Sequence, residues 1–222
     1  KDLADHVSTV HEAVEAGHLG QARTELAKIV GRDTQNLSEK EIIRAAVETA
    51  AEGTLDGIVS PLFYAGLGGA PLAMAFKAVS TLDSMVGYQN DRYREFGSAS
   101  ARLDGILNFI PARLSVILIA MGALLSGDKV WQAFRLGWRD GLKNPSPNSG
   151  FPEAAFAGAL GVKLGGVNTY EGTTVAKPIL HEKGREAALA DLVRSTRLMY
   201  FSSFFALLMA LSLRWVIEWS RA

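Results

Sequence analysis

Three long stretches without a charged side chain constrain what this chain can fold into. They run over residues 57–76, 114–127 and 198–213. A helix needs about 20 apolar residues to cross a bilayer. The third stretch is the best transmembrane candidate, because Arg214 can extend its charge to the interface and residues 215–217 continue the apolar run. A soluble helical protein with a central C-terminal helix stays the alternative.

Glycine and proline interrupt the first uncharged stretch. They are Pro61, Gly66, Gly68, Gly69 and Pro71. Non-helical backbone is tolerated at membrane depth where protein or a cavity covers it, so this pattern indicates a broken or re-entrant helix. We therefore predict an all-α fold, a helical integral membrane protein with broken or re-entrant helices and polar loops.

Composition excludes several classes of function. The 222 residues carry 23 Lys and Arg against 23 Asp and Glu, and this balance argues against a nucleic-acid partner. The absence of cysteine removes thiolate nucleophiles, iron–sulfur clusters and cysteine zinc sites. The four histidines show no metal-binding spacing. Chemistry must then use carboxylates, amides, hydroxyls and bases, with a hard metal as an optional addition.

We interpret the chain as a single domain, 1–222. Its parts are a helical hairpin (1–30), a main motif region (31–113), two apolar helices (114–127 and 198–217) and Pro/Gly-rich loops (144–166). Ser38 followed by Glu41 predicts a capping box at the start of the third helix. None of the glycine-rich segments is a Walker A loop, so nucleotide binding would need another geometry.

Three carboxylates stand at i, i+4 and i+8 on this third helix. Glu48, Glu52 and Asp56 would share one helical face. Like charges at this spacing repel, and a Mg²⁺ ion bound with nucleotide phosphates would satisfy them. The alternative is a solvated acidic face helped by Arg44, and the spacing does not decide between them.

Residues 77–113 embed cations and carboxylates among small and apolar residues. They include Lys77, Asp83, Arg92, Arg94, Arg102, Asp104 and Arg113. These cations could bind an anionic ligand, and ordinary ion pairs are the alternative. A helix break near Asn108 and Pro111 could fold Arg102 and Arg113 toward one pocket that also holds Asp104.

Nine short motifs identify a family. They are GRDT (31–34), ETAAExxxDG (48–57), PLFY (61–64), GGAP (68–71), TLDSMVGY (81–88), SARLD (100–104), PAR (111–113), SPN (146–148) and LGG (164–166). Their order and spacing resemble those of the CobD/CbiB family, the adenosylcobinamide-phosphate synthases, from about residue 3 to residue 205. Members usually carry a further hydrophobic N-terminal region, whose absence here suggests a truncated integral membrane protein.

The resemblance implies an ATP-dependent amide ligase of cobalamin biosynthesis. Such an enzyme joins adenosylcobyric acid to (R)-1-aminopropan-2-ol phosphate, or to ethanolamine phosphate, and gives adenosylcobinamide phosphate. It implies Mg²⁺ with ATP, and a corrinoid as substrate rather than cofactor. It also implies a multi-pass protein of the bacterial inner membrane, in contact with lipid, with no nucleic acid. A homo-oligomer or other membrane proteins of the pathway are possible partners.

The same resemblance suggests roles for the residues in its motifs. Catalytic candidates are Glu48, Glu52, Asp83 and Asp104; metal candidates are Glu48, Glu52 and Asp56; substrate-binding candidates are Arg32, Lys77, Arg102, Asn108, Arg113, Ser146 and Asn148.

Three positions depart from the family pattern. Gly53 and Ser80 stand where the family has Asn, and Gly105 stands where it has the second Asp of a pair. Loss of one preorganised polar group typically lowers activity by about 10²–10³-fold. A non-catalytic membrane relative that binds a corrinoid or a partner protein is therefore the alternative function.

Overall fold

The computed structural model describes residues 2–86 and 94–220 as a helical protein with one β-hairpin. In chain order the elements are α1 (Asp2–Glu15), α2 (Leu19–Leu26), α3 (Glu39–Thr54), the π-helical turn η1 (Leu55–Val59), α4 (Ser60–Val86), α5 (Arg94–Leu107), α6 (Phe109–Ser126), α7 (Val130–Asp140), the 3-10 turn η2 (Gly141–Lys143), α8 (Gly150–Leu160), β1 (Leu164–Tyr170), β2 (Thr173–Leu180) and α9 (Ala190–Trp219). The last two residues of the TLDSMVGY motif, and Arg92, lie outside the described ranges.

Three helical segments are long and apolar enough to cross a membrane. They are Glu39–Met85, Phe109–Ser126 and Ala190–Trp219, and they contain the three uncharged stretches except for Gly127, which follows the end of α6. Large apolar side chains on them face outward, for example Leu124 (68% exposed), Leu211 (58%) and Trp215 (62%). Exposed apolar surface of this extent needs lipid or protein to cover it. The predicted all-α membrane fold is confirmed.

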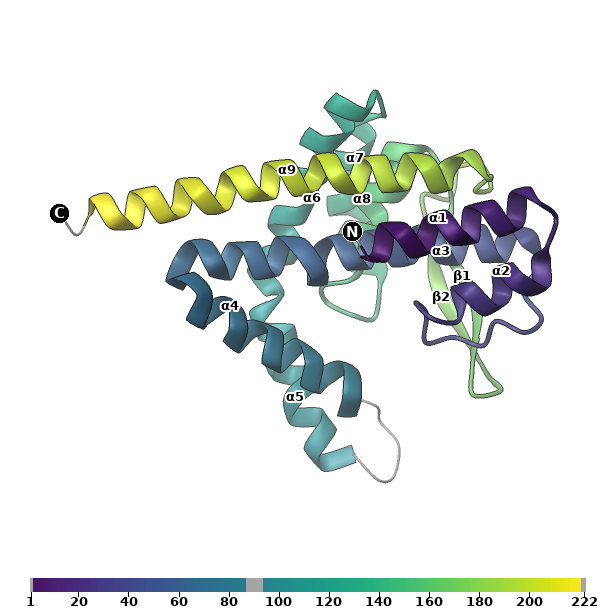
Figure 1. The fold of residues 1–222 in the computed structure, drawn as a ribbon, viewed down its shortest axis with the longest axis horizontal. Helices are drawn as coiled ribbons and strands as arrows, with labels where there is room; N and C mark the ends of the chain where they lie inside the picture. Colours follow the sequence, from purple (N-terminus) through teal and green to yellow (C-terminus); the bar gives the residue numbers. More distant parts are fainter. Residues whose placement is uncertain (1, 87–93, 221–222) are drawn as a thin grey trace.

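The predicted break in the first apolar segment occurs inside α4. Gly68 (φ −136°) and Gly69 (φ 67°, ψ −160°) leave the helical conformation, and Pro71 follows them. Proline removes one backbone donor and its ring clashes with the preceding turn, while Gly69 adopts a conformation open almost only to glycine. Figure 1 shows the result, because α4 runs out beside α9 and then turns back toward α5.

Small residues let the apolar helices approach closely. A Cβ on Gly122 of α6 would lie 2.6 Å from the Ser202 hydroxyl of α9, and one on Gly66 of α4 would lie 2.8 Å from the Ala210 carbonyl oxygen. Close backbone contact supplies the packing energy that the hydrophobic effect cannot supply between helices in lipid. These glycines therefore fix α4 and α6 against α9.

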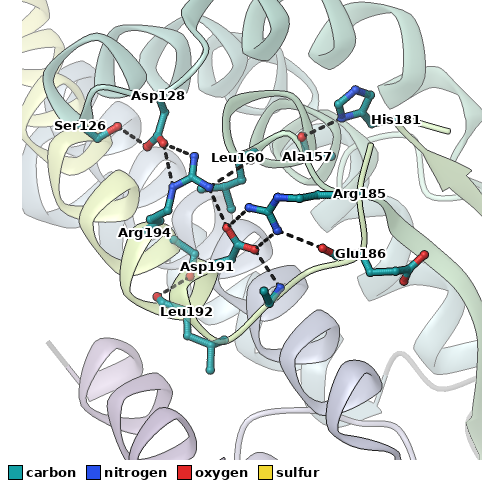
Figure 2. A network of polar contacts seen from close by, with 12 residues as sticks. Ser126, Asp128, Ala157, Leu160, His181, Arg185, Glu186, Asp191, Leu192 and Arg194 are labelled. Carbon is teal, nitrogen blue, oxygen red and sulfur yellow. Dashed lines mark hydrogen bonds and ion pairs between the residues drawn. The ribbon is translucent and has the colours of Figure 1, made fainter. Parts of the chain in front are cut away.

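An ion-pair network fixes the start of α9 (Figure 2). Buried Asp191 accepts hydrogen bonds from Arg185 (2.6 and 2.7 Å) and from Arg194 (2.7 Å). Arg194 also pairs with Asp128, just beyond the end of α6, at 2.5 Å, and Ser126 donates to Asp128 at 2.5 Å. The network thus ties the end of one apolar helix to the beginning of another.

The N-terminal hairpin of α1 and α2 packs against α3. Val10, Leu26 and Ile42 are fully buried between these helices. The predicted capping box is present, with the Ser38 backbone N–H donating to Glu41 Oε2 at 2.8 Å. It starts α3 where the chain leaves the hairpin.

The loop expected over residues 144–166 contains a helix instead. Gly150–Leu160 forms α8, which is buried along its whole length, and residues 164–166 begin β1. The glycines that suggested a loop serve packing, since a Cβ on Gly158 would lie 2.9 Å from the Cα of Ala133 in α7. The glycine pattern suggested a loop because the sequence does not reveal this close contact between α8 and α7.

The β-hairpin is held onto the GRDT loop. Its turn places Glu171 (φ 48°) and Gly172 (φ 77°) in left-handed conformations, as in a tight two-residue hairpin. Asp33 accepts hydrogen bonds from both backbone N–H groups, at 3.2 and 2.9 Å, and its own N–H donates to the Thr169 carbonyl at 2.8 Å. These bonds fix the hairpin beside α3.

Replacing Gly69 by alanine tests the α4 break. Because φ 67° with ψ −160° is strained for any residue with a Cβ, we expect Gly69→Ala to lower the free energy of unfolding by about 1–3 kcal/mol. Gly57→Ala is the matched control, since a Cβ there meets no atom within 4 Å. Thermal unfolding in detergent measures both, and equal melting temperatures would contradict the assigned strain.

Candidate active site

A buried ion pair anchors the polar interior. Glu48 of α3 is 1% exposed and pairs with Arg32 at 2.7 Å. The Gly165 N–H donates to Glu48 Oε1 at 2.7 Å, and Arg32 donates to Asn168 Oδ1 at 2.8 Å. Burial would lower the pKa of Arg32, but the charge of Glu48 and its hydrogen bond raise it. Arg32 and Glu48 thus join α3 to the GRDT loop and to β1.

A second carboxylate pair lies beside this ion pair. Glu153 of α8 is 1% exposed and lies within hydrogen-bonding range of Glu52. Burial, followed by the charge of Glu52, raises the pKa of Glu153 well above its usual value. Lys177 of β2 lies 3.9 Å from Glu52, and although burial would lower its pKa, the two glutamates raise it. Glu52, Glu153 and Lys177 thus form a second charged group beside the Arg32–Glu48 pair.

A third carboxylate approaches from α5. Asp104 Oδ2 accepts a hydrogen bond from Asn108 at 3.0 Å, and Asn108 Oδ1 accepts one from Ser60 at 2.5 Å. Asp104 Oδ1 is buried and has no hydrogen-bond partner in residues 2–86 and 94–220. Burial raises the pKa of Asp104, the Asn108 bond lowers it, and the net shift is upward. Asp104 is thus held in place through one of its two carboxylate oxygens.

Asp56 links the two groups of carboxylates. It lies within electrostatic range of Asp104, Glu52, Lys77 and Asp83. We call Glu48, Glu52, Asp56, Asp83, Asp104 and Glu153 the carboxylate belt. The π-helical turn inserts one residue into the helix at this point, and such turns occur frequently at functional sites. The Asp56 side chain is exposed at this turn.

The structure does not gather Glu48, Glu52 and Asp56 around one ion. Across the described parts of the chain, no three acidic or histidine side chains are grouped to hold a metal. Glu48 pairs with Arg32, and Glu52 lies near Glu153 and Lys177. Asp56 lies in the π-helical turn that follows α3. The i, i+4, i+8 spacing places side chains on one face only in a regular α-helix, and here the π-helical turn Leu55–Val59 interrupts the α-helical geometry at Asp56.

The two arginines expected in one pocket are separated. A cleft of about 830 Å³ between α5 and α6 is lined by Arg102, Gly105 and Pro147 among others, and Arg113 is not part of its lining. Arg113 stacks on Phe109 at 3.5 Å. The prediction of a shared pocket is therefore wrong, because the Arg113 side chain turns onto an aromatic ring.

The remaining predicted residues support the cleft or lie near the belt. Arg113 donates to Asn148 at 3.4 Å, and Asn148 donates to the Gly105 carbonyl at 2.8 Å, so both hold the cleft wall. The Ser146 hydroxyl accepts from the Ser149 N–H at 3.3 Å and closes a turn. Lys77 is exposed on α4.

Sequence reasoning missed Glu153 and Lys177. Glu153 is the one charged residue in the otherwise apolar segment 150–160, and a lone charge in an apolar run is the signal that could have found it. Lys177 carries no such signal, because its neighbourhood is set by the register of the hairpin.

The family described as CobD/Cbib protein matches residues 1–199. This chain belongs to the CobD/CbiB family. It is 49% identical over 216 residues to cobalamin biosynthesis protein CobD of Klebsiella pneumoniae, covering 97% of this chain and 68% of that protein. It is 50% identical over 207 residues to CobD of Yersinia enterocolitica (93% and 65%), and 47% over 214 residues to CbiB of Salmonella typhimurium (96% and 67%).

The chain spans about two thirds of the length of these CobD/CbiB relatives. No solved structure matches it. Of the three positions expected to depart from the family pattern, Gly105 lines the cleft and has open space for a side chain, whereas a Cβ on Gly53 would overlap the Leu3 side chain. Ser80 is buried on α4.

Breaking the Arg32–Glu48 pair in this CobD/CbiB protein should be costly. Arg32→Met leaves a buried carboxylate without its cation, and we expect a loss of about 3–5 kcal/mol in stability. The double variant Arg32→Met/Glu48→Met removes both charges and should recover most of that loss. Melting temperatures measured in detergent test this expectation. Equal destabilisation of the single and the double variant would contradict a charge-pair role for Arg32 and Glu48.

Neutralising Glu153 should stabilise the protein, in contrast to breaking the Arg32–Glu48 pair, and the gain in stability should depend on pH. Because its pKa is raised, the folded protein binds more protons than the unfolded chain above the usual glutamate pKa, and stability falls as pH rises. We expect Glu153→Gln to raise the melting temperature at about pH 8, with a difference that shrinks toward about pH 5. Exposed Glu15→Gln is the control and should show no such trend.

Proposed function

We propose that this protein acts in cobalamin biosynthesis as an ATP-dependent amide ligase. The observation that carries the proposal is its membership of the CobD/CbiB family, with relatives named cobalamin biosynthesis proteins at close to half identity. The carboxylate belt, of which Glu48 and Glu153 are buried, and the cleft bearing Arg102 support it. The substrates are adenosylcobyric acid, ATP and an amino alcohol phosphate, and the product is adenosylcobinamide phosphate.

The reaction proceeds in two balanced steps. The corrinoid carboxylate attacks the γ-phosphorus of ATP, which gives an acyl phosphate and ADP. The deprotonated amine then attacks the acyl carbon, forms the amide bond and releases inorganic phosphate. Before the second step, the ammonium group must lose a proton to a nearby base.

The Glu52–Glu153 pair is suited to take that proton. Glu153 is buried, the neighbouring charge of Glu52 favours its protonated form, and Lys177 lies 3.9 Å from Glu52. A buried pair that gains a proton avoids an unpaired second charge. Arg102 in the cleft is suited to bind the phosphate of the amino alcohol, because its planar fork matches phosphate oxygens.

The α5 end of the belt fits Mg²⁺ with ATP. Magnesium commonly uses one or two carboxylates together with phosphate oxygens and waters. Asp104 supplies a buried oxygen without a hydrogen-bond partner in the described ranges, with Asp56 and Asp83 within electrostatic range of this part of the belt. Bound there, the ion would neutralise phosphate charge. Asp104 and one neighbour would hold it, which differs from the triad predicted from spacing.

The protein would work in the bacterial inner membrane as a multi-pass protein. Its three candidate spans support a membrane location. A corrinoid is large, and the open cleft at α5 and α6 gives access from outside the helix bundle.

Turnover with purified protein in lipid tests the function. Adenosylcobyric acid, ATP, Mg²⁺ and aminopropanol phosphate should give adenosylcobinamide phosphate and one ADP per amide bond formed, read by mass spectrometry. Corrinoid binding without turnover would instead support a non-catalytic relative, and Gly105→Asp then asks whether the missing carboxylate restores activity.

Within this assay, Arg102→Ala should separate phosphate binding from corrinoid binding. We expect the KM for aminopropanol phosphate to rise roughly 10- to 100-fold, since a hydrogen bond to a charged group contributes about 1.5–3 kcal/mol. The KM for the corrinoid should change little. Lys40→Gln removes an exposed cation far from the cleft and is the control. A change confined to the corrinoid KM would overturn the phosphate assignment.

A further inference from the structure

Asn108 lies at the junction between α5 and α6, and its side chain does not cap the helix that follows. It is the N-cap residue of α6, where an asparagine oxygen commonly accepts from the N–H of the second or third helical residue. Within the described residues the Asn108 side chain makes no such bond, and Pro111, the third residue of α6, has no N–H to donate. Asn108 is 1% exposed, so its amide needs other partners.

Both ends of the Asn108 amide are used in contacts between helices. Its Nδ2 donates to Asp104 Oδ2 of α5 at 3.0 Å, and its Oδ1 accepts from the Ser60 hydroxyl at 2.5 Å. Ser60 is fully buried and begins α4 directly after the π-helical turn. A carboxylate can only accept, so the amide must present its N–H group to Asp104 and its oxygen to Ser60. The chain Ser60–Asn108–Asp104 thus joins the start of α4 to the end of α5.

This chain fixes the direction of the Asp104 carboxylate. The terminal torsion of an aspartate side chain is otherwise broad, and a hydrogen bond to one oxygen narrows it. The bond is made to Oδ2, whereas Oδ1 is buried and has no hydrogen-bond partner in residues 2–86 and 94–220. Asn108 therefore holds the carboxylate by one oxygen and sets where the other one points.

Other contacts at the end of α5 act on the backbone. The Tyr64 hydroxyl donates to the Leu107 carbonyl at 2.7 Å, and Asn148 donates to the Gly105 carbonyl at 2.8 Å. These bonds place the helix end as a whole. Among the described residues, Asn108 is the one whose side chain donates to the Asp104 carboxylate itself.

We infer that Asn108 and Ser60 are positioning residues, which hold the Asp104 carboxylate in the orientation that binds Mg²⁺ with ATP. The inference rests on the proposed function, from which the ion and the nucleotide come. It gives Asn108 a role other than the substrate contact that the family motifs suggested, and it assigns a role to Ser60. Partners that orient a ligating carboxylate typically change metal affinity by about 10–100-fold.

Nucleotide binding without turnover tests this role. The full protein in nanodiscs is titrated with β,γ-imido-ATP by calorimetry, once with Mg²⁺ and once with a chelator, and the ratio of the two Kd values gives the Mg²⁺ contribution. We expect Asn108→Ala to lower this ratio roughly tenfold or more and to leave the Kd without Mg²⁺ unchanged. Ser60→Ala should lower it less, because Asn108 remains, and this variant makes the same comparison if Asn108→Ala does not fold.

Ser115→Ala is the matched control. It removes an equally buried hydroxyl, which donates to the Ala112 carbonyl at 2.7 Å, and it should leave the Mg²⁺ contribution unchanged. In an Asp104→Asn background, Asn108→Ala should have no further effect, because Asn108 acts through Asp104.

Three results would overturn the inference. One is an equal loss of nucleotide affinity with and without Mg²⁺ in Asn108→Ala, and another is a full further loss in the Asp104→Asn background, since both indicate a general structural role. The third is a Mg²⁺ contribution that is absent in the wild type or unchanged in Asp104→Asn, which would place the ion elsewhere even where turnover supports the ligase. Absence of amide product together with the expected binding pattern would count against the ligase function and support the positioning role.

Discussion

The buried Arg32–Glu48 pair is the interaction on which the polar interior depends. The Glu48 carboxylate is 1% exposed on a membrane-associated helix and therefore requires a cationic partner. Arg32 of the GRDT loop is that partner. The same carboxylate accepts the Gly165 N–H, so the β-hairpin is drawn onto α3. Once the hairpin is in place, Lys177 reaches Glu52 and Glu153. The Arg32–Glu48 pair thus supports the position of the hairpin residue that meets the rest of the belt.

A second constraint comes from lipid. The candidate spans pack through small residues where Gly66 of α4 and Gly122 of α6 meet α9. The kink at Gly69 then returns α4 toward α5, which carries Asp104. A straight α4 would lead the chain away from the belt. The break is therefore what brings carboxylates from distant segments to one place.

The two arginines of the cleft show how one residue type acquires two roles. Arg102 stays exposed in the cleft, where it can meet an anion. Arg113 stacks on Phe109 and holds Asn148, which in turn holds the Gly105 carbonyl. The first residue is available to a ligand, and the second shapes the wall behind it. The sequence motifs alone do not distinguish the roles of the two arginines. The residues that surround each arginine in the fold do.

The sequence by itself determined the helical membrane class, the break at Gly68 and Gly69 and the capping box at Ser38, because each follows from residues close together in the chain. Motif order also identified the family. Only the tertiary structure decided that Glu48 binds Arg32, that α8 replaces an expected loop, and that Glu153 and Lys177 join Glu52. Those contacts join residues far apart in the chain. They depend on a π-helical turn, a hairpin register and the packing of α7 on α8, which no local pattern specifies.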